Sequence, residues 1–264
     1  MTGLRLDEEA QMYAAERQQR ILTVARAAGR VEVAALADDL AVSPETIRRD
    51  LTTLEGLGAL RRVHGGAIPV ERLGFEPTVA TRSERHVAEK QRIAKVALEQ
   101  VPLEGTVLID AGTTTLRLAE LLPRDRELTV VTNSLPAAIA MSGITTVQLF
   151  LLGGRLRHRT QASVGHWLEG ALRELTVDVA FLGTNGLSLR RGLTTPDPGE
   201  ALAKAAMVAA ARRAIVLTDS SKVGDEHFSR FADLEDIAAV ITDSRLDDET
   251  AQLIENEGPE VIRA

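Results

Sequence analysis

Apolar residues recur every three to four positions between Ser43 and Leu60, which is the spacing of one face of a helix. The residues that we expect on this inward face are Ile47, Leu51, Leu54 and Leu57. Ser43 is a favoured N-cap and Pro44 suits the first helical position, so the helix is expected to begin there and to end at Gly58. Hydroxyl and guanidinium groups occupy the opposite face, which is the face that DNA can contact.

Two further helices and a basic hairpin flank this segment. The pattern predicts a helix over Arg17–Ala28 and a short helix over Val33–Leu40, which a brief turn joins to the helix that begins at Ser43. This helix-turn-helix, over about residues 33–57, is a DNA-binding arrangement. The segment Ala59–Val70 predicts a β wing around a Gly-Gly turn. The candidate DNA contacts are Ser43, Glu45, Thr46, Arg48, Arg49, Arg61, Arg62 and His64. An ordinary solvated helix face is the alternative for the arginines of the helix taken alone.

A different rhythm begins at His86, where short apolar runs alternate with amphipathic ones. The predicted strands are Thr106–Ala111, Glu127–Thr132, Val147–Gly154, Val177–Gly183, Ala214–Asp219 and Ala238–Asp243. The predicted helices are His86–Gln100, Thr114–Leu122, Leu135–Met141, Val164–Leu175, Gly199–Arg212 and Asp247–Glu257. This alternation indicates an α/β domain with a mostly parallel sheet that is buried on both faces.

The joint between the two patterns is polar. Residues 69–85 contain two prolines and one glycine and show no sustained period, so we expect a linker over 71–85. The domains are then 16–70, for DNA binding, and 86–264, which is the larger α/β domain.

Polar clusters follow the predicted strands, at the edge of the sheet where ligands of α/β proteins collect. The candidate ligand-binding residues at these strand ends are Asp110, Gly112, Thr113, Thr114, Thr115, Thr132, Asn133, Gly153, Gly154, Arg155, Gly183, Asn185, Gly186, Asp219 and Lys222. Helix amides, lysine and arginine suit a phosphate, and carboxylate and amide groups suit sugar hydroxyls. Lys222 and Arg155 are the expected phosphate ligands. Any one cluster taken alone also fits an ordinary strand-to-helix turn, which needs the same residue types.

The net charge of the chain, -7, changes this picture only after it is divided between the domains. Residues 16–68 hold eight basic and seven acidic residues, a net charge of +1, so the remaining -8 lies outside them. Binding of phosphates therefore depends on the local placement of arginines. The chain has no cysteine, and its five histidines include no pair at ligand spacing, so we expect no metal site and no cofactor.

Neither a membrane span nor a signal peptide is predicted in the 264 residues, and we expect a cytoplasmic protein. Trp167, the only tryptophan, is expected to fill core or interface space.

Several motifs are similar to those of a known family. SPETIRRDL and LRRVHGGA in the first domain resemble the DeoR/GlpR family of bacterial transcription regulators. In the second domain the resemblance continues through EKQRIAKVA, DAGTTT, VTNSL, LLGGRLR, TPDPGEALAK and TDSSKVG. It implies a winged helix-turn-helix repressor whose effector domain is similar in fold to sugar-phosphate isomerases.

The resemblance also implies an effector and its site. Glu200 and Lys204 would border the effector pocket, although at four residues apart they also fit an ion pair that supports their own helix. The effector would be a phosphorylated sugar, with a preference for fructose 1-phosphate, and would release the protein from double-stranded operator DNA. Because one module touches few phosphates, we expect a homo-oligomer, either a dimer or a tetramer.

Two other functions are compatible with parts of this pattern. A sugar-phosphate isomerase-like enzyme with an appended DNA-binding domain would use Asp110, Glu200 and Lys222 for proton transfer. A nonspecific DNA-coating protein would bind DNA without regard to sequence or effector. The DNA-reading module and the family resemblance favour a non-enzymatic regulator of a sugar catabolic operon.

Overall fold

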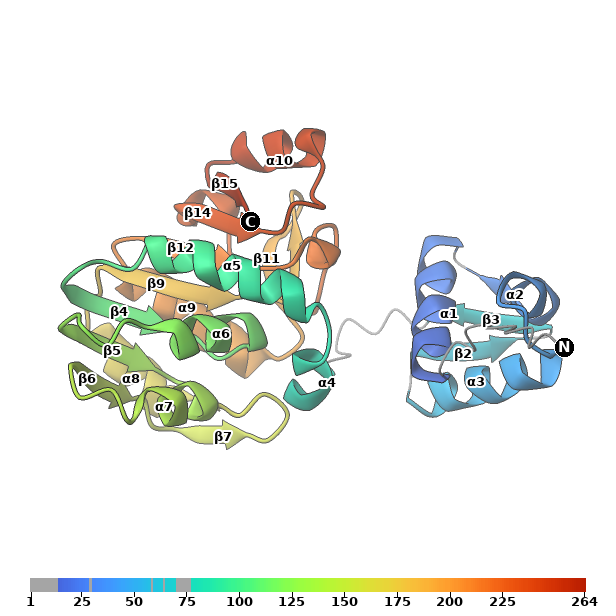
Figure 1. The fold of residues 1–264 in the computed structure, drawn as a ribbon, viewed down its shortest axis with the longest axis horizontal. Helices are drawn as coiled ribbons and strands as arrows, with labels where there is room; N and C mark the ends of the chain where they lie inside the picture. The colour runs from blue at the N-terminus through green and yellow to red at the C-terminus, as the bar shows by residue number, and fades with distance from the viewer. Residues whose placement is uncertain (1–13, 29, 58, 64, 70–76) are drawn as a thin grey trace, which may run out of the picture. The chain divides into compact units, whose positions relative to one another are not determined.

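A computed structural model describes residues 14–28, 30–57, 59–63, 65–69 and 77–264 of the chain (Figure 1). The chain divides into two compact units, residues 1–75 and residues 76–264. None of the described helices is both long and apolar enough to span a membrane.

The first unit is a three-helix core with a small sheet. Its elements are α1 (Ala14–Ala28), β1 (Val31–Glu32), α2 (Val33–Asp39), α3 (Pro44–Gly56), β2 (Leu60–Val63) and β3 (Gly66–Pro69). Ile21, Leu36, Ile47 and Leu51 meet in its buried core. Gly58, the predicted end of the third helix, lies outside the described residues. Leu57 was predicted to face inward, and this is wrong: it is 60% exposed, because α3 ends at Gly56 before the apolar stripe returns to the core.

The strand β1 had no signal in the sequence, because two residues are too few to show a period. It pairs with β3, so that the sheet order is β1-β3-β2. A Cβ atom at Gly66 would lie 1.9 Å from the Val31 carbonyl oxygen, so only glycine permits this close pairing.

The second unit is built on a parallel sheet of seven strands, in the order β15-β14-β12-β9-β4-β5-β6. These strands are β4 (Gly105–Ile109), β5 (Leu128–Thr132), β6 (Val147–Leu151), β9 (Val179–Gly183), β12 (Ala214–Leu217), β14 (Ala239–Thr242) and β15 (Glu260–Arg263). The first six match the predicted strands, and the short carboxyl-terminal β15 was not predicted.

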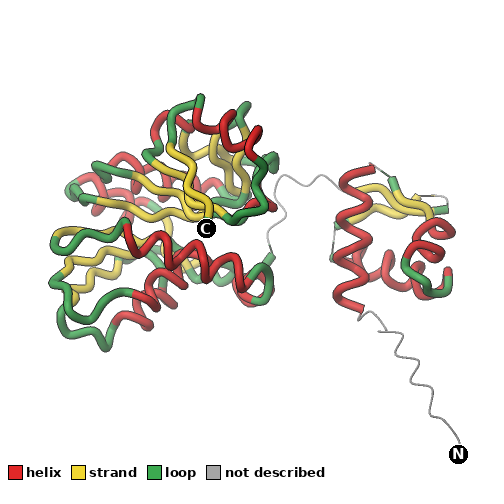
Figure 2. The backbone as a smooth tube through the Cα atoms, turned by 45° about the horizontal axis from the view of Figure 1, so that its top comes forward, coloured by secondary structure: helices red, strands yellow, loops and turns green. Residues whose placement is uncertain are grey.

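Helices cover both faces of this sheet (Figures 1 and 2). α5 (Val87–Glu99), α6 (Thr113–Leu121) and α7 (Leu135–Met141) share one buried cluster with the sheet. α8 (His166–Arg173), α9 (Pro198–Ala210) and α10 (Asp248–Glu255) contribute to the other. The prediction of an α/β fold with a mostly parallel sheet buried on both faces is confirmed.

Short elements complete this unit. The strands β10 (Gly186–Ser188), β11 (Gly192–Thr195) and β13 (Ser229–Ala232) form an antiparallel sheet, and β7 (Arg155–Arg157) pairs with β8 (Ala162–Val164). Two 3₁₀ turns cover Ser220–Lys222 and Leu234–Asp236. Runs of three or four residues carry no usable period, so none of these elements was predicted.

The predicted linker differs from the structure at its carboxyl end. Residues 79–83 form the helix α4 (Val79–Ser83), where the prolines and the lack of a period had indicated no helix. The Thr78 side chain caps α4 by accepting a hydrogen bond from the Thr81 amide at 3.3 Å. The Val79 amide donates to the Arg159 carbonyl at 3.0 Å, which attaches α4 to the turn between β7 and β8 of the same unit.

Candidate functional site

The outer face of α3 presents the side chains predicted to contact DNA. The Ser43 hydroxyl accepts a hydrogen bond from the Thr46 amide at 3.1 Å, which fixes the beginning of the helix. Arg48 and Arg49 are both exposed, and Arg48 donates to the Glu45 carboxylate at 3.0 Å. A surface pair of this kind is weak, so the guanidinium can exchange Glu45 for a base or a phosphate.

The wing adds a further arginine to this face. The Arg62 guanidinium donates to the Thr52 hydroxyl at 3.1 Å, and the main-chain amide of Arg62 donates to the Glu55 carboxylate at 3.0 Å. Both bonds tie β2 to the outer side of α3. His64 and the side chain of Arg61 lie outside the described residues, so their predicted roles stay predictions.

A buried carboxylate holds the DNA-binding helix from behind. Asp50 is 3% exposed, accepts from Arg17 Nε at 2.5 Å and accepts from Gln18 at 2.9 Å. These bonds join α3 to α1. Sequence reasoning missed Asp50, although a charged residue between the apolar positions Ile47, Leu51 and Leu54 was a signal for a buried partner.

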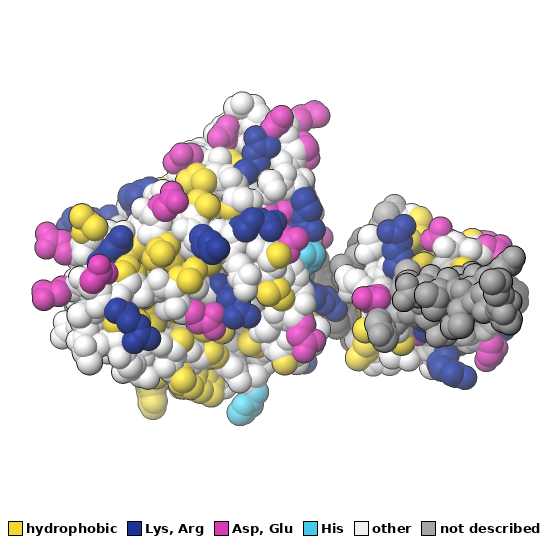
Figure 3. Space-filling model, in the orientation of Figure 1, with side chains coloured by type: hydrophobic (Ala, Val, Ile, Leu, Met, Phe, Trp, Pro, Cys, Tyr) yellow, Lys and Arg dark blue, Asp and Glu magenta, His cyan; other side chains and the backbone are white. Residues whose placement is uncertain are grey.

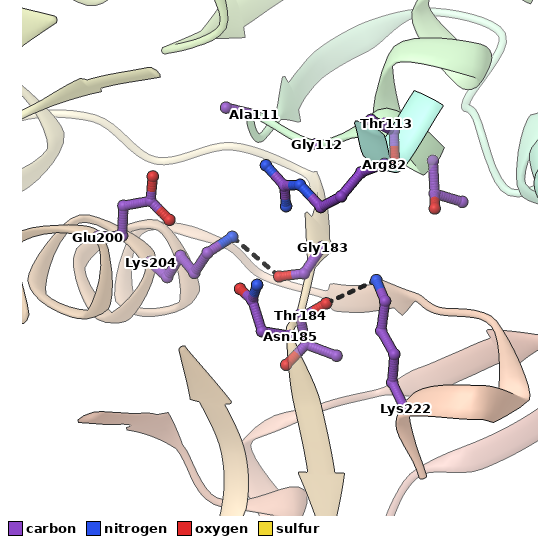
Figure 4. Close-up of a pocket in the computed structure, with 11 residues that line it drawn as sticks. Arg82, Ala111, Gly112, Thr113, Gly183, Thr184, Asn185, Glu200, Lys204 and Lys222 are labelled. Atoms are coloured by element: carbon purple, nitrogen blue, oxygen red, sulfur yellow. Dashed lines mark hydrogen bonds between the residues drawn. The ribbon is translucent and has the colours of Figure 1, made fainter. Parts of the chain in front are cut away.

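A polar pocket lies at the carboxyl ends of β4 and β9 in the second unit (Figure 4). The predicted residues that line it are Gly112, Thr113, Thr114, Gly183, Asn185, Glu200, Lys204 and Lys222. Ala111 and Thr184, which belong to two of the predicted strand-end clusters, also line it, and so does Arg82, which sequence reasoning missed. Arg82 comes from α4, and its guanidinium points toward the space between Ala111 and Lys204 in Figure 4. Its position within the predicted linker removed it from consideration.

Asp110 and Lys204 form a buried ion pair beneath the pocket. Lys204 Nζ donates to the Asp110 carboxylate and, at 2.9 Å, to the Gly183 carbonyl. Asp110 also accepts from the Gly183 amide at 3.1 Å, and 1% of Asp110 is exposed. Burial raises the pKa of Asp110 above its ordinary value, and the Lys204 ammonium opposes that rise. The pair therefore joins the carboxyl ends of β4 and β9 to the middle of α9.

Glu200 and Lys204 do not pair with each other, so the ion pair that their spacing allowed is wrong. Glu200 instead accepts hydrogen bonds from Arg157 and Thr160, which belong to the β7–β8 hairpin. Arg157 also reaches Asp197, the N-cap of α9, at 3.3 Å. The hairpin is thereby fastened to the beginning of α9.

Positive charge gathers on another side of the pocket. Lys222 Nζ donates to the Thr184 carbonyl at 2.8 Å and lies 3.9 Å from the Asp219 carboxylate. Burial lowers the pKa of Lys222, Asp219 opposes the change, and the charges of Arg82 and Lys204 add to it. Asp219 is itself buried, which alone would raise its pKa, but the Lys222 charge and a hydrogen bond from Ser221 hold that pKa below its ordinary value.

A second lysine lies behind this group. Lys90 on α5 is 3% exposed, and its Nζ donates to the carbonyls of Arg82 and Arg85, at 2.6 Å for the latter. Burial and the neighbouring Lys222 lower the pKa of Lys90 to about 8. This lysine fixes the main chain of α4 and the residues after it, from which the Arg82 side chain extends.

Several predicted residues support the pocket from behind. Asn133 accepts from the Ala111 amide at 2.9 Å and donates to the Ser163 carbonyl at 3.2 Å. Thr132 donates to the Ile109 carbonyl at 2.6 Å, and Thr115 to the Gly112 carbonyl at 3.1 Å. Gly186 lies on β10, where a Cβ atom would come within 2.4 Å of the Asp225 carbonyl oxygen. These groups are committed to main-chain partners and do not line the pocket.

The cluster after β6 also lies outside the pocket lining. Gly153, Gly154 and Arg155 were predicted as ligand contacts, with Arg155 as a phosphate ligand, but the structure places none of them there. β6 is an edge strand, two positions away from β4, so its end does not meet the ends of β4 and β9. Arg155 is exposed at the beginning of β7.

Comparison with known proteins agrees with both halves of this structure. Residues 17–72 match the DeoR-like helix-turn-helix domain, and residues 85–244 match the DeoR C terminal sensor domain. The chain belongs to the DeoR family. It is 39% identical over 251 residues to the HTH-type transcriptional regulator GlpR of Haloferax volcanii, covering 95% of this chain and 98% of that protein. It is 33% identical to the putative aga operon transcriptional repressor of Escherichia coli O157:H7, covering 94% and 93% of the two chains.

More distant similarity concerns the fold alone. Ribose 5-phosphate isomerase A of Methanocaldococcus jannaschii aligns with a TM-score of 0.38 at 18% identity, covering 51% of this chain and 53% of that one. The relatives with high coverage are named as transcriptional regulators, and this DeoR-family chain is a DNA-binding transcription regulator. Among the described residues, no group of three or more acidic or imidazole side chains is placed to hold a metal ion.

Proposed function

We propose that this regulator represses a sugar catabolic operon and leaves its operator when a phosphorylated sugar occupies the pocket at the ends of β4 and β9. The observation that carries the proposal is the position of the Arg82 side chain. Its Nε atom is buried and has no hydrogen-bond partner among the residues that the structure describes, and the side chain lines the pocket. A buried donor of this kind lacks an acceptor, and a phosphate oxygen supplies one.

The beginning of α6 provides the rest of the phosphate subsite. Gly112 is the N-cap of α6, and none of the described side chains caps the helix there. The first amides of a helix and its positive end favour an anion, and both Thr113 and Thr114 line the pocket. A glycine at the cap leaves the main chain open to close approach by the ligand.

The remaining lining suits the sugar itself. Asn185 and Glu200 offer amide and carboxylate groups to hydroxyls, and Lys204 offers an ammonium beside them. Because Lys222 and Arg82 repel each other electrostatically, a bound phosphate would stabilise both cations. The same donors and acceptors suit fructose 1-phosphate, a pentose phosphate or glycerol 3-phosphate, and of these we propose fructose 1-phosphate.

The operator would be read by α3. Its exposed arginines, Arg48 and Arg49, are placed near the amino end of a helix that enters the major groove, and Arg62 adds a phosphate contact from the wing. One such surface makes few contacts. Two copies that read two half-sites would supply useful affinity, so we propose a dimer or a tetramer.

The arrangement of the acidic groups favours binding over catalysis. Asp110 is paired with Lys204, and Glu200 is paired with Arg157, so each carboxylate that an isomerase would use as a base already accepts strong hydrogen bonds. We propose that the pocket does not turn over its ligand. Incubation with a panel of aldose and ketose phosphates tests this, since conversion at enzymatic rates would contradict it.

A two-stage experiment tests the proposed regulator. Thermal denaturation with phosphorylated sugars and their unphosphorylated counterparts identifies the effector, because a ligand that binds the folded state alone raises its stability. A DNA fragment selected in vitro from random sequence then serves as operator in a fluorescence anisotropy assay. We expect the sugar phosphate that raises the melting temperature to weaken operator affinity. Its unphosphorylated form should change neither the melting temperature nor the operator affinity. Stabilisation by none of the phosphates, or stabilisation without any change in operator affinity, would refute the proposal.

A further inference from the structure

The two edges of the seven-stranded sheet differ in their protection. An edge strand exposes unpaired amide and carbonyl groups, and monomeric proteins shield such edges with charged side chains. The edge at β15 follows this rule, since Glu260 and Arg263 are charged and exposed. The edge at β6 does not follow it, since its sequence is Val-Gln-Leu-Phe-Leu. Within the described part of the chain, no strand pairs with the outer side of β6.

The lack of charge extends well beyond β6. No acidic or basic residue and no histidine occurs from Leu128 to Gly154, although charged residues make up 26% of the chain. This segment contains β5, α7 and β6, and only β5 is enclosed on both sides by other strands. The segment therefore brings a charge-free helix and strand to the border of the second unit.

Apolar side chains surround this open edge on both faces of the sheet. Phe150 is 48% exposed. It is paired with Val131, which packs with α8 and α9, so Phe150 lies on the same face of the sheet as those helices. Leu151 follows it on the opposite face, beside α7, and is 50% exposed. The neighbouring exposed apolar residues are Leu135 and Ile139 on α7, Leu156 on β7 and Trp167 on α8. Figure 3 shows apolar side chains gathered along the lower border of the second unit, where Figure 1 places α7 and β7.

The exposed area is the size that an interface requires. These six side chains are 37% to 71% exposed. Together they leave on the order of 600 Å² of apolar surface in water, close to the roughly 800 Å² that each partner contributes to a standard interface. Trp167, at 71% exposed, does not fill the core, and tryptophan is a preferred residue at the centre of protein interfaces.

We propose that this surface, formed by β6, α7, β7 and α8, is where two copies of the chain associate about a twofold axis, with their β6 strands side by side and antiparallel. A second copy is the occupant that fits, because an edge strand complements itself in an antiparallel pair and the charge-free segment 128–154, which holds β6 and α7, brings no like charges together there. The Leu152 amide donates inward to the Thr132 carbonyl, so by alternation the main-chain groups of Leu149 and Leu151 point outward. The inference rests on the oligomer in the proposed function and gives it a location.

Charge substitutions test the surface directly. Leu151→Lys and Ile139→Lys place an ammonium on exposed positions of the patch, and Leu253→Lys makes the same change at a 44% exposed position on α10. Sedimentation equilibrium of the full chain, without DNA or sugar, measures association. We expect wild type and Leu253→Lys to form dimers or larger even-numbered assemblies at micromolar concentration, and the two patch variants to dissociate with a constant at least about 30-fold higher. Circular dichroism checks that each variant is folded.

Cysteine cross-linking tests the strand pairing itself, since the chain has no cysteine of its own. Near a twofold axis, a residue in the middle of β6 faces its own copy within the Cα separation of about 4.4–6.8 Å that a disulfide needs. Leu149→Cys, Phe150→Cys and Leu151→Cys are therefore oxidised separately, with Leu253→Cys as the control. We expect a covalent dimer from at least one β6 position and none from the control.

Three results would overturn the proposal: a monomeric wild type, patch variants that keep the wild-type mass, or β6 cysteines that cross-link no better than Leu253→Cys. These measurements use neither ligand. Failure of the chain to bind a sugar phosphate or an operator would therefore refute the proposed function and leave the interface standing.

Discussion

Replacement of Arg82 by glutamine separates a ligand-binding role from a structural one. The side chain lines the pocket, and within the described part of the chain its buried Nε atom makes no hydrogen bond that the substitution could remove. The main-chain carbonyl of Arg82, which accepts from Lys90, is unaffected by the substitution. We expect Arg82→Gln to keep or slightly raise the melting temperature while it weakens effector binding.

The size of the loss follows from the interaction that the substitution removes. A hydrogen bond to a charged group contributes about 1.5–3 kcal/mol, which corresponds to a roughly 10- to 150-fold higher dissociation constant for the phosphorylated sugar. Arg82→Lys retains the charge and removes the planar donor group, so its affinity for the phosphorylated sugar should lie between that of wild type and that of Arg82→Gln. Isothermal titration with the most stabilising sugar phosphate, and with inorganic phosphate as the minimal probe, measures the loss.

The control is Arg92→Gln, which makes the same change of charge on an exposed residue of α5 outside the pocket lining. Its dissociation constant should stay within about twofold of wild type, since screening weakens an exposed charge. An Arg82→Gln affinity equal to wild type, or an equal loss in both variants, would refute the assignment of Arg82 to the phosphate. A fall in the melting temperature of unliganded Arg82→Gln would instead indicate a structural role.

Three further outcomes are expected. Arg49→Ala should relax base preference at one operator position, at a cost of about 1–3 kcal/mol. Arg62→Ala should weaken binding to all sequences alike and reduce the slope of log affinity against log salt concentration by about 1. Competition binding over a salt series measures both, and equal effects of Arg49→Ala on every sequence would contradict its assignment to base reading. Asp50→Ala should destabilise the DNA-binding unit by about 2–3 kcal/mol in thermal or urea unfolding, because it removes the charged partner of Arg17, and an unchanged midpoint would show that the pair contributes nothing. Burial alone would raise the pKa of Asp243, but hydrogen bonds from Arg245 and Ser220 to its carboxylate lower that pKa to about 2. The stabilisation of about 2 kcal/mol that follows should be complete above about pH 5 and lost as the pH falls toward 2, relative to Asp243→Asn. Parallel acid unfolding curves for the wild type and that variant would contradict this.

The DNA-binding helix was predictable in its beginning and in most of its faces. Ser43 and Pro44 are local signals whose effect depends on the helix alone, and the structure shows the expected cap. The apolar stripe was predicted correctly at Ile47, Leu51 and Leu54. Its extension to Leu57 was wrong, because the spacing of apolar residues predicts which face of a helix is buried and does not show where the helix leaves the core.

The pocket was predictable only in part. Strand ends such as Gly112 to Thr114 carry their polar character in the sequence, and they line the pocket. Arg82 lies in a stretch that has the composition of a linker, and its role depends on α4 packing against the rest of the second unit through contacts of Val79 and Lys90. Such contacts join residues that are distant or aperiodic in sequence, so no local pattern reports them.

By itself, the sequence determined the division into a helical DNA-binding unit and an α/β unit, because hydrophobic period and capping are properties of short segments. It also determined that polar side chains end most strands of the larger unit. Only the tertiary structure decided which strand ends meet, since the order of strands in a parallel sheet depends on long-range pairing. That order brings Asp110 of the β4 end to Lys204 of α9, keeps the residues after β6 out of the pocket lining, and leaves β6 with one side open.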